Sequence, residues 1–80
     1  MERAAVLQVL RDKAAELLEL EPDEVQEDRA FESDLGVDSL SFVELVMELE
    51  DSLGVELPEQ LAAGASTVGA LVDPIVARSP

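Results

Sequence analysis

The residue types that most often do chemistry are nearly absent from this sequence. It contains no histidine, cysteine, tyrosine or tryptophan. A nucleophile or general base would have to be a carboxylate, Lys13 or a hydroxyl group with no adjacent base to activate it. No acidic segment has the D-x-D/N-x-D/N-G spacing of a calcium loop. We expect no catalytic activity of the chain's own and no metal site. The alternative is a small hydrolase that uses a carboxylate, although the most common general base, histidine, is missing from the chain.

One serine nevertheless stands at a place where chemistry could occur. Ser39 lies in the segment LGVDSL, directly before a strongly periodic apolar run. Asp38 and Ser39 are both residue types that cap helix N-termini, and Ser41 with Glu44 matches the S-x-x-E capping box. Gly36 lets the chain turn into the helix. This pattern by itself predicts that Ser39 caps a helix.

Two helices and a long loop are predicted around this serine. Residues 3–19 favour a helix that ends before Pro22, with one apolar face made by Val6, Leu7, Leu10, Ala14, Leu17 and Leu18. A polar connection follows, and its length favours a packed or functional loop, with apolar anchors at Val25, Phe31 and Leu35. Residues 39–53 favour the second helix, which Gly54 ends.

The C-terminal part predicts two more helices. The segment LPEQLAAG favours a short third helix, with Pro58 at its first position and Gly64 at its end. The segment STVGALVDPIVAR favours a fourth helix that begins at Ser66 or Thr67. The predicted fold class is all-α: a small four-helix bundle in one domain, residues 1–80, with a long loop between its first two helices.

A proline interrupts the fourth predicted helix. Pro74 cannot donate a backbone hydrogen bond, and its ring crowds the preceding turn. We expect the helix to kink or split there, with Asp73 as a new N-cap.

The second predicted helix carries two apolar stripes. One is an ordinary core face made by Phe42, Leu45, Val46, Leu49 and Leu53. The other consists of Leu40, Val43 and Met47, and its acidic neighbours are Glu44, Glu48 and Asp51. The second stripe is either part of a wide core or an exposed strip for a partner with an apolar groove and basic rim. Periodicity alone leaves both open.

Charge restricts the partners. Five basic and nineteen acidic residues give a net charge of −14, which excludes nucleic acid and anionic membrane as expected partners. Ten of the acids lie between Arg29 and Arg78 with no base among them. This region is either a solvated surface or a docking face for basic proteins. The N-terminal segment MERAAVLQVL lacks signal-peptide organisation, so we expect a cytoplasmic protein.

Five segments, taken in their order along the chain, resemble the acyl carrier protein family, and the resemblance extends over nearly the whole chain. The resemblance rests on LLELEPDEV, AFESDLGVDSL, VELVMELE, LGVELP and STVGALV. It implies that Ser39 carries 4′-phosphopantetheine, derived from coenzyme A, through a phosphodiester, and that the thiol of this arm holds acyl cargo as a thioester. A helix N-terminus suits such an anion. The absence of cysteine leaves the arm with the sole thiol.

The resemblance also implies partners. They are a phosphopantetheinyl transferase, an acyltransferase or acyl-ligase, a ketosynthase and other pathway enzymes with basic docking surfaces, acting on a monomeric carrier. The residues expected to meet them are Asp34, Asp38, Leu40, Val43, Glu44, Met47, Glu48 and Asp51.

Three departures from the family's pattern bear on the pathway. Ser41 and Phe42 stand where fatty-acid carriers often have acidic or small polar residues, and Pro74 interrupts a helix that lines the acyl cavity in the family. We expect a freestanding carrier for polyketide or other specialised biosynthesis. A fatty-acid or aminoacyl carrier is an alternative, as is an acidic helical adaptor that binds basic proteins without a prosthetic group.

Overall fold

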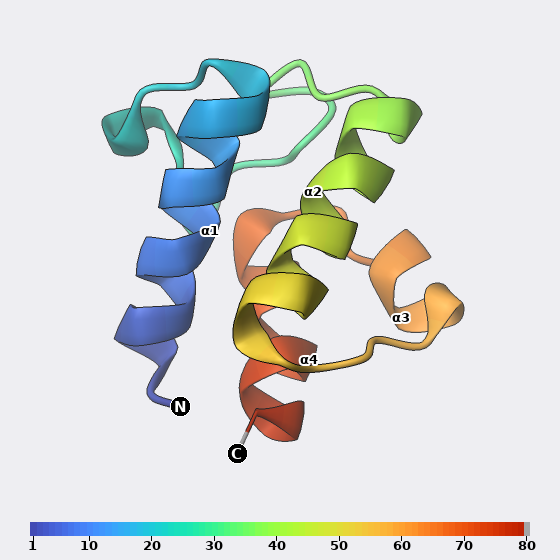
Figure 1. The fold of residues 1–80 in the computed structure, drawn as a ribbon. Coiled ribbons are helices and arrows are strands. Elements are labelled where there is room, and N and C mark those ends of the chain that lie inside the picture. Colours follow the sequence, from blue (N-terminus) through green and yellow to red (C-terminus); the bar gives the residue numbers. More distant parts are fainter. Residues whose placement is uncertain (80) are drawn as a thin grey trace.

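The computed structural model describes residues 1–79, and within them the chain is an all-α bundle (Figure 1). Its elements are α1 (Arg3–Leu18), a 3-10 turn η1 (Pro22–Glu24), α2 (Ser39–Leu53), α3 (Glu59–Ala63) and α4 (Val68–Arg78). Helix α1 packs against α2 and α4, and the short α3 packs against α4. The predicted four-helix bundle with a long first connection and a short third helix is confirmed. No helix within 1–79 is long and apolar enough to span a membrane.

The core is entirely apolar and almost entirely aliphatic. No polar or charged residue within 1–79 is buried. The largest fully buried side chains come from three helices and the first connection: Leu10, Leu45, Leu49, Leu71, Ile75, Val6, Val25, Val68 and Val72. Burial of this aliphatic surface is the main source of stability in a small chain that has no cysteine to form a disulfide.

Two predictions about α1 are wrong. The helix ends at Leu18 rather than at residue 19, because Glu19 adopts the left-handed conformation with φ 57°. Leu17 is 38% exposed instead of buried. It lies in the last turn of α1 beside a hollow of about 360 Å³ that Leu35 and Gly36 also line, so no element covers it.

The first connection is packed, as predicted. Val25 and Phe31 are buried, and Leu35 is partly buried against the core. Val37 is buried too, although the sequence analysis did not single it out. These anchors draw the connection down onto the helices and fix the entry to α2.

Backbone hydrogen bonds join this connection to the start of α4. The N–H of Phe31 donates to the carbonyl of Ser66 over 3.0 Å, and the N–H of Val68 donates to Arg29 over 3.0 Å. The N–H of Gly69 donates to the carbonyl of Glu27 over 2.9 Å. A Cβ atom on Gly69 would lie 3.1 Å from that carbonyl oxygen, so the close approach favours glycine. The connection thus pairs with first-turn N–H groups that would otherwise lack partners in α4.

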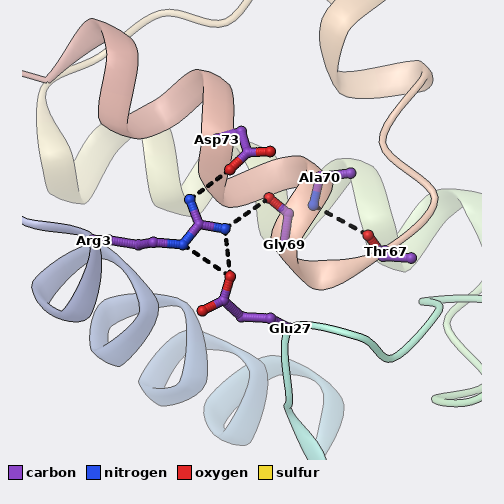
Figure 2. A network of polar contacts seen from close by, with 6 residues as sticks. All are labelled: Arg3, Glu27, Thr67, Gly69, Ala70 and Asp73. Atoms are coloured by element: carbon purple, nitrogen blue, oxygen red, sulfur yellow. Dashed lines mark hydrogen bonds and ion pairs between the residues drawn. The ribbon is translucent and has the colours of Figure 1, made fainter.

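At the N-terminal end of α1, Arg3 joins this helix to the first connection and to α4 (Figure 2). The Arg3 guanidinium donates to Glu27 in the first connection and to Asp73 in α4. It also donates to the Gly69 carbonyl over 3.4 Å. Hydrogen bonds from the guanidinium to Glu27, and then to Asp73, raise the pKa of Arg3. These contacts form the Arg3 clamp.

The expected split of the last helix at Pro74, with Asp73 as a new N-cap, is wrong. Helix α4 runs continuously from Val68 to Arg78 with Pro74 inside it, and Thr67 is its N-cap. The Asp73 carboxylate binds Arg3 and is not the N-cap of a new helix. Leu71, Val72 and Ile75 are buried on both sides of the proline, and this burial holds the helix together despite the missing hydrogen bond.

Candidate functional site

The predicted attachment residue lies at the first position of α2. Asp38 has extended backbone angles, and its side chain accepts a hydrogen bond from the Ser41 N–H over 2.8 Å. Asp38 is therefore the N-cap. Ser39 does not cap the helix, and Ser41 with Glu44 does not form the capping box that the pattern suggested. Ser39 is exposed, and its hydroxyl makes no hydrogen bond to any residue within 1–79.

The carboxylate beside Ser39 stays ionised. The pKa of Asp38 is lowered first by the backbone N–H of Ser41 and then by the Ser41 hydroxyl. Desolvation opposes these two bonds with a smaller effect, and the Leu40 N–H lowers the pKa by the least. Cap and free hydroxyl are thus adjacent but belong to different residues. Ser39 therefore has a fixed negative charge one residue away.

The geometry fits a phosphodiester on Ser39. The first turn of α2 directs backbone N–H groups and a partial positive charge toward its N-terminal end. Anions bind at such ends. The exposed hydroxyl leaves room for a bulky group, and the Asp38 cap does not depend on the Ser39 hydroxyl.

A groove of about 990 Å³ begins at Ser39 and follows α2 toward α3. Its apolar lining comes from the first connection, from α2, and from the segment around α3: Ala30, Phe31, Val37, Phe42, Val43, Val46, Met47, Leu57, Ala62, Ala63 and Ala65. Pro74 is not among its lining residues. No residue of α4 lines this groove, so Pro74 has no direct contact with it.

Two aromatic rings meet in this groove near Ser39. The ring centroids of Phe31 and Phe42 are 5.0 Å apart and the rings are inclined by 66°. Phe31 is 4% exposed. Phe42 is only partly buried, so it is less a core residue than its stripe predicted. It packs against the core and also forms groove wall.

The second stripe of α2 is exposed. Leu40, Val43 and Met47 are 69%, 51% and 62% exposed, so the wide-core interpretation is wrong. We call these three side chains the α2 strip. Leu61 in α3, which the sequence analysis did not single out, is 41% exposed. A single exposed Leu or Met is common on protein surfaces, but a row of exposed apolar side chains on one helix is typical of an interaction surface.

The predicted acidic residues differ in their surroundings. Glu44 and Asp51 are exposed. Glu48 lies 3.9 Å from the Lys13 ammonium, and Asp34 accepts a hydrogen bond from the Ala30 N–H over 2.7 Å. Glu48 and Asp34 therefore have contacts within the chain itself.

Glu50 has a structural contact that the sequence analysis missed. Its carboxylate accepts a hydrogen bond from the Leu57 N–H over 2.7 Å, which fixes the connection to α3. On the helical wheel Glu50 lies between the two apolar stripes of α2, and that position is the sequence signal that could have pointed to this contact.

The sequence of the chain is similar to known proteins. A family model described as a phosphopantetheine attachment site matches residues 8–75. The chain is 42% identical over 78 residues to an acyl carrier protein of Prochlorococcus marinus (strain MIT 9515), covering 98% of each chain. It is 45% identical over 65 residues to an acyl carrier protein of Sulfurovum sp. (strain NBC37-1), covering 81% of this chain and 87% of the other.

A solved structure is similar over the whole fold. It is an acyl carrier protein from Enterococcus faecalis, with a TM-score of 0.81 and 39% identity. The match covers 99% of this chain and 100% of that one.

Proposed function

The chain belongs to the acyl carrier protein family, and from that premise we propose that Ser39 is the residue to which 4′-phosphopantetheine is attached. Membership implies a covalent arm of this kind. When bound, the arm supplies a thiol that holds an acyl group as a thioester. In this proposal the protein delivers acyl intermediates to partner enzymes and has no catalytic role of its own.

One observation carries the assignment to Ser39. Its hydroxyl is exposed and free of hydrogen bonds to residues 1–79, and it stands at the N-terminus of α2 where the groove begins. An anion attached there would benefit from the helix dipole. Cargo on the arm could reach the apolar groove without crossing the core.

The attachment step is enzyme-dependent, because no base of this chain contacts the hydroxyl. The Ser39 oxygen attacks the phosphorus of coenzyme A that bears the pantetheine. The diphosphate bond breaks, and adenosine 3′,5′-bisphosphate leaves with the electron pair. The serine proton passes to a base or water supplied by the phosphopantetheinyl transferase. Asp38, ionised and one residue away, is a recognition point for that transferase.

The α2 strip and nearby acids are the proposed docking surface. Partners with basic surfaces would pack an apolar patch on Leu40, Val43 and Met47 and pair cations with Glu44 and Asp51. Glu48 would have to exchange its contact with Lys13 for one with a partner. Expected partners are the transferase, an acyltransferase or acyl-ligase, and a ketosynthase.

The pathway part of the proposal rests on Phe42. An aromatic ring in the groove wall beside the attachment point differs from the small polar residue expected in a fatty-acid carrier. We therefore favour polyketide or other specialised biosynthesis over fatty-acid synthesis or aminoacyl transport. The intact mass of the protein purified from its native host tests this part, because the adduct identifies the cargo. An ordinary saturated fatty-acyl series on the arm would contradict it.

The attachment is tested with a promiscuous phosphopantetheinyl transferase and coenzyme A. We expect the intact protein to gain the mass of one arm, and fragmentation to assign the added mass to Ser39. An adaptor without a prosthetic group would gain nothing. Mass found on Ser33, Ser41, Ser52 or Ser66 would contradict the assignment while keeping the carrier function.

A further inference from the structure

Phe42 stands where a chain attached at Ser39 would enter the groove. It lies one helical turn after Ser39 in α2, and residues three apart share a helix face. Its ring lines the groove. We propose that Phe42 selects the cargo held there: it favours an uncharged acyl chain that bears a flat unsaturated group, such as an aryl ring, over a flexible saturated chain of equal carbon number. The inference rests on the proposed attachment at Ser39.

Phe31 holds the Phe42 ring in a defined orientation. The Phe31 backbone is fixed on both sides, because its N–H donates to Ser66 over 3.0 Å and its carbonyl accepts from Val37 over 2.8 Å. The edge-to-face contact between the rings keeps Phe42 from lying flat against its neighbour. Phe31 is almost fully buried and Phe42 is not, so Phe42 has aromatic surface left for a ligand in the groove.

The size of the groove does not select the cargo. Its volume of about 990 Å³ is at the upper end of ordinary small-molecule sites, which span about 300–1,000 Å³. The wall near α3 is made by small side chains, Ala62, Ala63 and Ala65. Short and long chains therefore fit, and discrimination has to come from the chemistry of the wall near Ser39.

The charge along the groove restricts the cargo further. The charged residues that line it are all acidic, namely Glu32, Asp38, Glu50 and Glu59. No lysine or arginine is among the lining residues within 1–79. A chain that ends in a carboxylate would meet only like charges among the ionisable groups that line the groove, so the groove suits a neutral chain.

Ring–ring contacts give the expected size of the preference. An aromatic pair in edge-to-face or offset geometry contributes energy beyond its buried area. Expressed as a ratio of populations, this corresponds to roughly two- to tenfold. The preference should therefore appear as a ratio of that size between two cargoes of equal carbon number, one with a terminal phenyl ring and one saturated.

The experiment loads the full chain with each cargo from the corresponding acyl-coenzyme A and the promiscuous transferase. Two readouts are taken: the rate at which hydroxylamine cleaves each thioester, and the NMR shifts of the Phe42 ring protons. We expect the phenyl-bearing thioester to be cleaved roughly two- to tenfold more slowly than the saturated one. It should also shift the ring protons more.

Three variants locate the effect. Phe42→Leu should bring the ratio of cleavage rates close to one, whereas Phe42→Tyr, which keeps the ring, should retain it. Leu57→Met changes another lining residue without touching the ring pair and should also retain the ratio. Circular dichroism checks that each variant is folded, and Phe42→Tyr with the ring shifts tests the proposal even if Phe42→Leu unfolds.

The outcomes separate this inference from the proposed function. If no variant or native chain gains an arm, the proposed function fails and the inference with it. If the arm attaches at Ser39 but the native ratio is near one, or Phe42→Leu retains the ratio, the selection by Phe42 is overturned and the carrier function stands.

Discussion

Asp38 and Ser39 are adjacent at the start of α2, and the sequence pattern allowed either of them to be the helix cap. Asp38 caps the helix through its bond from Ser41, and Ser39 presents a free hydroxyl. We therefore predict that Ser39→Ala abolishes arm transfer while lowering the free energy of unfolding by about 1 kcal/mol or less, since the cap is intact. Intact mass after the transferase reaction and a denaturation curve measure the two effects. Arm transfer to the variant would contradict the prediction.

The ionisation of Asp38 predicts a pH dependence of stability. Hydrogen bonds to the carboxylate lower its pKa in the folded protein, so the folded state binds this proton less readily than the unfolded state. The stabilising contribution is complete above the unfolded pKa of about 3.9. It disappears as the pH falls through the lower folded-state pKa.

Asp38→Asn provides the matched control, because asparagine caps a helix but does not titrate. The difference in unfolding free energy between the two proteins should be constant near neutral pH and shrink below about pH 4. Urea denaturation across a pH series measures it. A difference that grew on acidification would mean that the protonated carboxyl is the better cap.

The two stripes of α2 predict opposite responses to truncation. Met47 is 62% exposed and Leu49 is fully buried. Leu49→Ala should cost about 2–5 kcal/mol of unfolding free energy, whereas Met47→Ala should hardly change the melting temperature. Met47→Ala should instead slow processing by the transferase or a ketosynthase, because it removes apolar contact from the α2 strip. Equal destabilisation by both variants would mean that Met47 contributes to the core as Leu49 does, and would contradict the prediction.

Helix α4 makes a separate prediction about Pro74. The proline leaves the Ala70 carbonyl without its intrahelical partner. Pro74→Ala restores a donor and a better helix former, so we expect a gain of up to about 3 kcal/mol in unfolding free energy. Thermal denaturation of both proteins measures it. A loss of stability would mean that the groups around Pro74 are adapted to the proline ring.

The sequence predicted the elements whose evidence is local. The periodic apolar run fixed α2 at residues 39–53, and Gly54 ends it with φ 66°. What the sequence could not supply depends on distant partners. The Asp73 side chain binds Arg3, 70 residues away, and the burial around Pro74 keeps α4 continuous.

The same distinction holds at the site. The local pattern at Ser39 predicted only a helix cap, and its role as attachment residue came from the family resemblance and stays a prediction. The exposed α2 strip was recognised as one of two possibilities. Only packing decided between them, because exposure depends on which elements cover a helix face. The groove and the contact of Phe42 with Phe31 also require the first connection to fold back on α2. The apolar periodicity of the sequence does not predict that packing.

The charge of the whole molecule predicts how salt affects its fold and its associations. The chain has nineteen acids and five bases, and the long-range ion pairs between side chains of residues 1–79 are made by Arg3 and Lys13. Screening acts over about 8 Å near physiological ionic strength and should relieve repulsion among the carboxylates. We predict that moderate NaCl raises the melting temperature and slows association with the transferase. One salt series with both measurements checks the two effects.

The Arg3 clamp is the control for this prediction, because salt weakens its ion pairs with Glu27 and Asp73. Arg3→Met removes the clamp, and we expect a lower melting temperature with a steeper rise on adding salt. A melting temperature that falls with salt in the native protein would mean that its ion pairs outweigh the repulsion. An unchanged association rate would remove the acidic surface from partner recognition.

The pairing of the first connection with the start of α4 has a consequence for the order in which the protein is completed. Phe31 is held by Ser66, and Gly69 is held by Glu27, so the groove wall next to Ser39 cannot form until the chain has been synthesised well beyond α3. An emerging chain that ends after α2 would expose Ser39 without its surroundings. In the finished protein, the amide protons of Phe31, Val68 and Gly69 should exchange with solvent in one common opening event, because breaking either segment releases both.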